Sequence, residues 1–217
     1  MRPHALVLAG AALCALSVSA SATDAGWYLG LGAGLNQNSD ATLSGAEVAA
    51  LNLPGSPAVA FNPTWRGTAI AGYGWSNHLR LEGEFGYSDA GLDKICVGST
   101  CEVITGHDAE QMSLMANLLY DAPIAEKWFL TFGGGAGYAW LKEGETGAYK
   151  YASALTWQAI GGVTYKVSSS LDLQLDYRYS SIHGLTFGTG AGEAKIDLLP
   201  SNNLMLSVRW YVGPDVL

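Results

Sequence analysis

The stretch that decides the fold is LRLEGEFGYS, residues 79–88. Its large apolar residues all carry odd numbers, and its charged residues all carry even numbers. Because a β-strand sends alternate side chains to opposite faces, one face of this strand is apolar and the other is charged. In a soluble sheet the apolar face would pack on a core. In a transmembrane β-barrel it would contact lipid, and the charged face would fill the barrel.

The same alternation recurs in seven other segments. They are residues 27–36, 65–75, 111–121, 128–140, 155–166, 171–179 and 204–212. The apolar faces are about as long as the ~9–11 residues with which a strand crosses a membrane. Aromatic residues on these faces gather near the strand ends, as amphipathic rings do at the two interfaces of a bilayer. We therefore assign six tryptophans to the interfaces: Trp65, Trp75, Trp128, Trp140, Trp157 and Trp210.

The connections between these segments alternate in length. Short connections are predicted at residues 77–78, 122–127 and 168–170, and long ones at residues 37–63, 89–108, 141–151 and 181–198. Outer-membrane barrels have short periplasmic turns and long extracellular loops, which predicts that both termini are periplasmic. The sequence therefore predicts an all-β fold, an eight-stranded antiparallel up-and-down transmembrane β-barrel.

The first 22 residues, MRPHALVLAGAALCALSVSASA, are typical of a secretory signal peptide. A basic residue precedes an apolar run, and small residues in an A-x-A arrangement end at Ala22. The run is shorter than the ~20 residues that a membrane-spanning helix needs. Cleavage after Ala22 would remove Cys14 and leave residues 23–217 as the barrel domain.

Composition excludes some functions and predicts one covalent link. With 19 acidic residues against 11 basic ones, the chain is a poor candidate for binding nucleic acid. Cys96 and Cys101, in CVGSTC, are predicted to form a local disulfide in an exported protein. Two thiols without a nearby pair of histidines make a poor zinc site, and no cofactor is expected.

Nine charged residues fall on the inward faces of the predicted strands. They are Arg66, Arg80, Glu82, Glu84, Lys166, Asp172, Asp176, Arg178 and Arg209. The interior of an eight-stranded barrel is just wide enough for side chains, so these groups must pair with one another or hold a few waters. Glycines at every second position, such as Gly30, Gly32 and Gly34, are predicted to leave room for them. The alternative hypothesis is a narrow or gated ion passage through the network.

Three segments carry a resemblance to a known family. They are GWYLGLGAGLN at 26–36, LDLQLDYRYS at 171–180 and LMLSVRWYV at 204–212. The chain resembles the OmpA-like and OmpX-like eight-stranded outer-membrane barrels, a porin-like group of bacterial surface proteins. These barrels usually end on an aromatic residue, whereas here GPDVL follows Val212. The resemblance implies a Gram-negative outer membrane, contact with its lipid including lipopolysaccharide, and insertion by the barrel-assembly machinery.

We expect a non-enzymatic protein that acts in envelope integrity, surface interaction or adhesion. Loops on a rigid scaffold would carry any host or surface ligand, and the first contains EVAALNL (47–53), a short helix or an apolar patch. Three hypotheses compete: a small pore, a lipid A-modifying enzyme, and a soluble periplasmic barrel that binds an apolar ligand. Ser181 and His183 are the residues that an enzyme could use, but they lack a clear acidic third partner.

Overall fold

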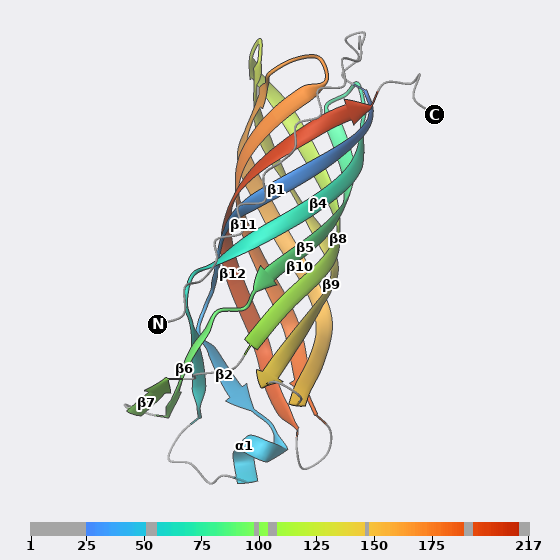
Figure 1. Ribbon diagram of the computed structural model, residues 1–217. Helices are drawn as coiled ribbons and strands as arrows, with labels where there is room; N and C mark the ends of the chain where they lie inside the picture. The colour runs from blue at the N-terminus through green and yellow to red at the C-terminus, as the bar shows by residue number, and fades with distance from the viewer. Residues whose placement is uncertain are drawn as a thin grey trace.

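The computed structural model describes residues 25–50, 56–97, 100–103, 108–145, 148–188 and 193–212. Eight antiparallel strands close into a barrel (Figure 1). They are β1 (Gly26–Asn38), β4 (Thr64–Gly74), β5 (Leu79–Asp89), β8 (Asp108–Ala125), β9 (Trp128–Glu145), β10 (Ala148–Lys166), β11 (Leu171–Phe187) and β12 (Ala194–Val212). The predicted fold class is confirmed. The predicted signal peptide, residues 1–22, lies outside the described ranges.

The barrel is closed by pairing between its first and last strands. Each strand pairs with the next in the order given, and β12 pairs back with β1 from Trp27 opposite Val212 to Asn38 opposite Ser201. Closure gives the backbone N–H and C=O groups along the ring hydrogen-bond partners. A lipid environment requires such partners, because it offers no water to form these hydrogen bonds instead. None of the helical residues in the described ranges forms a helix long and apolar enough to cross a membrane.

Alternation of polarity places each side chain inside or outside the ring. On β5, Arg80, Glu82 and Glu84 are buried, whereas Leu81 and Phe85 are exposed on the outer wall. β11 shows the same alternation along its first half. The outer wall is therefore apolar and the interior polar, the reverse of a soluble barrel.

Outward aromatic rings contact one another in two bands. The band near the short turns, here the turn-side girdle, comprises the pairs Trp27–Tyr73, Tyr73–Trp75 and Trp128–Tyr165, with ring centroids 4.7 to 5.3 Å apart. The band near the long connections, here the loop-side girdle, comprises Trp65–Tyr87, Tyr138–Trp140 and Trp157–Tyr179, at 5.4 to 5.6 Å. All six tryptophans assigned to the interfaces are exposed on the outer wall.

Several strands are longer than the alternation predicted. The connection predicted at 141–151 is wrong, because β9 runs to Glu145 and β10 starts at Ala148. Those predicted at 122–127 and 181–198 are also largely strand. The physical reason is a reversal of polarity beyond the loop-side girdle. There the inward Leu141 and Ala152 are buried, while the neighbouring outward positions Lys142 and Ser153 are polar.

The two longest predicted connections are folded as well. β2 (Ala41–Ser44), α1 (Ala46–Ala50) and β3 (Ala58–Phe61) lie between β1 and β4, and β6 (Leu92–Val97) and β7 (Thr100–Val103) lie between β5 and β8. Their strands pair in the order β2-β3-β6-β7, and β2 joins the barrel by pairing Ser44 with Lys195 of β12. We call these five elements the loop sheet; Figure 1 shows them at the end of the barrel opposite the end of β12. Helix α1 covers the first part of EVAALNL, whose last three residues lie outside the described ranges.

Candidate functional site

The interior holds two connected clusters of buried charge. In the cluster nearer the short turns, Arg80 forms ion pairs with Glu82 and Asp121, and its Nε lies 2.7 Å from Asp121 Oδ2. In the same cluster Arg209 Nη2 donates to Asp172 Oδ2 at 3.0 Å. Each guanidinium therefore has a carboxylate partner, as burial of a charge requires.

The second cluster lies deeper in the barrel and is centred on Glu84. Arg178 forms ion pairs with both Glu84 and Asp176. Arg66 Nη2 lies 3.7 Å from Glu84 Oε1, and Asn117 Nδ2 donates to Glu84 Oε2 at 3.1 Å. Glu84 is fully buried and depends on these three neighbours for compensation.

Gln174 connects the two clusters. Its Oε1 accepts hydrogen bonds from Arg80 Nη2 at 3.1 Å and from Arg209 Nη1 at 3.0 Å. Its Nε2 donates to Asp176 Oδ1 at 2.6 Å. The described interior charges therefore form one continuous network rather than separate pairs.

The structure brings the inward charges singled out in the sequence together, and eight of the nine are joined by the ion pairs and hydrogen bonds above. Lys166 is half-buried at the turn end, where its Nζ lies 5.1 Å from the centroid of the Phe129 ring and where it interacts electrostatically with Asp172 of the network. Sequence reasoning missed Asp121 and Gln174, and also Tyr28, which donates to Glu82 Oε1 at 2.8 Å. Their inward parity was the available signal, since it places them on the same faces as the charged residues.

Inward glycines make the space that these long side chains occupy. A Cβ atom on Gly86 would lie 2.2 Å from Arg66 Nη2, and one on Gly72 would lie 2.5 Å from the Tyr28 hydroxyl. A cavity of about 20 Å³ remains at the turn end, beside His78, Arg80 and Lys166. Such a volume holds about one water molecule.

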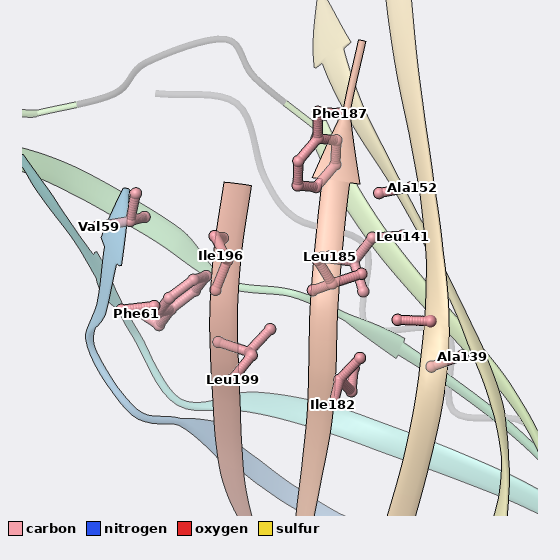
Figure 2. Packing of buried hydrophobic residues seen from close by; sticks show 12 residues of the cluster. Val59, Phe61, Ala139, Leu141, Ala152, Ile182, Leu185, Phe187, Ile196 and Leu199 are labelled. Carbon is pink, nitrogen blue, oxygen red and sulfur yellow. The ribbon is translucent and has the colours of Figure 1, made fainter. Parts of the chain in front are cut away.

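At the loop end an apolar cluster fills the side of the interior formed by β9 to β12, while buried uncharged polar residues such as Asn38 and Gln111 line the side formed by β1 and β8. Figure 2 shows Val59 and Phe61 of β3 beside Ile196 and Leu199 of β12, with further side chains from β9, β10 and β11 around them. We call this group the apolar cap: Ala41, Val59, Phe61, Ala139, Leu141, Ala152, Ala154, Ile182, Leu185, Phe187, Ile196 and Leu199. Gly184, with φ of +74°, interrupts the alternation on β11, and both Leu185 and Phe187 after it are buried.

The candidate catalytic and metal-binding groups are not assembled into a reactive site. His183 Nε2 accepts a hydrogen bond from Trp157 Nε1 at 2.9 Å, and the buried Ser181 Oγ has no hydrogen-bond partner. A serine nucleophile needs a base within hydrogen-bond reach, which Ser181 lacks here. Cys96 and Cys101 form a disulfide across the β6–β7 pair. Among the described residues, no group of three or more His, Cys, Asp or Glu could hold a metal ion.

Comparison with known proteins agrees with this architecture. Residues 6–210 match the model of the outer membrane protein β-barrel domain family. An outer membrane protein of Gluconacetobacter diazotrophicus is 28% identical over 210 residues, which cover 88% of this chain and 55% of that relative. The chain thus spans about half the length of the curated relative that it matches.

Two solved structures share the fold at low sequence identity. Neisserial surface protein A has a TM-score of 0.60 and 18% identity, and the match covers 86% of this chain and 97% of that one. The outer membrane protein OprG from Pseudomonas aeruginosa has a TM-score of 0.57 and 11% identity, and the match covers 87% and 98%. With its closed eight-stranded ring, apolar outer wall and charged interior, the chain belongs to the outer membrane protein β-barrel domain family and resides in the outer membrane.

Proposed function

We propose that this protein is a closed, non-enzymatic barrel that presents the loop sheet at the cell surface for binding to other molecules. The observation that carries the proposal is the combination of a filled interior with a folded sheet at one end. The ion-pair network fills one half of the barrel, and the apolar cap fills the end next to the loop sheet. A channel needs an open interior, whereas a display scaffold needs only rigid walls.

The apolar cap argues against the narrow-pore hypothesis. An ion that passed the charged network would next have to cross a region lined by residues such as Leu141, Leu185 and Leu199, all at most 5% exposed. Moving an ion into such surroundings without a compensating partner is strongly unfavourable. An ion would meet the charged network and then the apolar cap, and each of these regions opposes conduction for a different physical reason.

The loop sheet supports the binding role. All four residues of β7 are exposed, and Val103 is 68% exposed. The disulfide between Cys96 and Cys101 ties β6 to β7, and β2 ties the sheet to β12. Binding residues are concentrated on loops that a rigid scaffold positions, and long connections face the exterior in outer-membrane barrels.

Surface labelling tests the orientation. Ala50 in α1 and Ser168 in the turn between β10 and β11 are both exposed and lie at opposite ends of the barrel. We expect Ala50→Cys to react with a membrane-impermeant maleimide on intact cells, and Ser168→Cys to react only after the outer membrane is permeabilised. The reverse pattern would contradict the proposal.

Conductance of the purified protein in planar bilayers tests closure. We expect no channel openings above the lipid baseline. Phe61→Ala, which removes a large side chain from the apolar cap, provides a variant with a weakened seal. Steady ion-selective openings of the unmodified protein would overturn the display role in favour of a pore.

A further inference from the structure

We propose that a groove in the outer wall of the barrel binds an acyl chain of lipid A. The inference rests on the proposed orientation, because that orientation places the groove toward the outer leaflet. The groove has a volume of about 910 Å³ and crosses β5, β8, β9 and β10. It is separate from the ion-pair network and from the apolar cap.

Small residues form the floor of the groove. Gly83 of β5 is the cross-strand partner of Ala116 of β8, and Ala116 is the partner of Ala136 of β9. The next partner in this row is Trp157 of β10, whose large ring ends the row of small side chains. The floor is therefore a depression in the wall that runs across the strands.

Large outward side chains flank the floor on the loop side. Leu114, Tyr138 and Leu155 follow one another as cross-strand partners in the adjacent row. All three are exposed, and Leu155 is 68% exposed. They form an apolar wall along one side of the depression, and Trp157 closes its end on β10.

The position of the groove decides the class of its occupant. Tyr138 and Trp157 belong to the loop-side girdle, so the groove is continuous with the outer wall that contacts lipid. For an acyl chain already in lipid, the hydrophobic effect does not favour contact with the protein over contact with other lipid chains. Any preference for the protein must come from close van der Waals contact. A floor of glycine and alanine lets a saturated chain approach the backbone more closely than an ordinary wall of leucines does.

One polar side chain, His183, lines the groove, and a second, Lys142, lies beyond the groove toward the loop end of β9. His183 accepts the hydrogen bond from Trp157 Nε1 at 2.9 Å and is exposed. Lys142, four residues beyond Tyr138 on β9, lies with its Nζ 3.5 Å from Glu110 Oε2. Both side chains can donate to a phosphate oxygen. A ligand with acyl chains below and phosphate at the interface, which is the chemistry of lipid A in the outer leaflet, therefore matches the site.

Lipid retention measured by native mass spectrometry tests the inference. The folded protein in detergent micelles is mixed with hexa-acylated lipid A, or with phosphatidylglycerol of matched chain length. We expect the unmodified protein to retain one lipid A and Ala116→Leu, which fills the floor, to retain at least tenfold less. Ala33→Leu makes the same change on the outer face of β1, across the ring from β9, and is expected to retain lipid A as the unmodified protein does.

Two further arms make the result decisive. Gly83→Val fills the same floor from β5 and replaces Ala116→Leu in the test if that variant does not fold. Its added Cβ would lie 3.7 Å from the nearest atom, which is an ordinary van der Waals contact. Equal retention by filled and unfilled variants, or equal retention of phosphatidylglycerol, would overturn the assignment. The retention measurement is made in micelles and does not depend on the orientation of the protein in the cell. A failure to retain lipid A would therefore not change the conclusion from surface labelling, and a reversed labelling pattern would not change the conclusion from lipid retention.

Discussion

Arg178→Met is the substitution that most directly tests the buried network. Arg178 forms ion pairs with Glu84 and Asp176, and the three side chains are at most 1% exposed. Its removal leaves Asp176 with the amide of Gln174 and leaves Glu84 with Arg66 at 3.7 Å as its ion-pair partner. Removing one partner of a buried pair costs about 3–5 kcal/mol, because the remaining charge is uncompensated.

Neutralising Arg178, its two carboxylate partners and Arg66 separates lost attraction from stranded charge. In the combined variant Arg66→Met, Glu84→Gln, Asp176→Asn and Arg178→Met, no charge of this group stays without its partner, because Arg66 pairs with Glu84 and is neutralised with it. We expect it to recover most of the loss and to unfold within ~1–2 kcal/mol of the unmodified protein. Lys142→Met is the surface control, because it removes a partly exposed pair worth at most about 1 kcal/mol.

The assay is urea unfolding in lipid vesicles, followed by tryptophan fluorescence and by heat-modifiable mobility in gels. With a denaturant slope of about 1–3 kcal/mol per molar urea, the single substitution should lower the midpoint by at least ~1 M. Two results would refute the reasoning: a midpoint for Arg178→Met that matches Lys142→Met, or a combined variant as unstable as the single one. Either would mean that water already screens these charges.

Three other substitutions probe the wall, the cap and the membrane face. Gly137→Ala would place a Cβ 2.0 Å from the Leu114 carbonyl oxygen, so it should prevent correct folding or slow refolding strongly, whereas Gly161→Ala, with no atom within 4 Å, should refold normally in the gel-mobility assay. Phe61→Ala should cost ~3–5 kcal/mol locally, seen as faster amide hydrogen exchange in β2 and β3 while the barrel stays protected. Leu118→Arg, on the outer wall between the girdles, should lower the unfolding free energy by ~2–4 kcal/mol in vesicles, and Leu198→Arg beyond the loop-side girdle should leave it within ~1 kcal/mol.

Sequence reasoning succeeded where lipid and a narrow interior make opposite demands on neighbouring residues. The strand predicted at residues 79–88 is observed as Leu79–Asp89, since each of its positions must suit either lipid or the charged network. The same reasoning did not reveal which charges meet. Arg80 reaches Asp121 across β5 and β8 and Gln174 from the far side of the ring, and such contacts depend on the stagger of the closed barrel.

The loop sheet was beyond prediction for a different reason. Its strands β2 and β3 have four residues each, and neither alternates strongly enough to be recognised alone. The pairing of Ser44 with Lys195 joins segments that are far apart in the sequence. A strand of this length exists because a partner edge and the apolar cap hold it, so the information lies in the assembled end of the barrel.

The reversal of polarity on β9 shows how one strand can serve two environments. Up to Trp140 the outward residues are apolar, and from Leu141 onward the apolar residue is the inward one, while the next outward residue is Lys142. The change falls immediately after the loop-side girdle, so the girdle marks the level at which the outer wall stops contacting lipid. On the turn side of the girdle, stability depends on an interior that neutralises its charges. On the loop side, stability depends on an interior that excludes water. The same barrel can therefore contain ion pairs at one end and the apolar cap at the other.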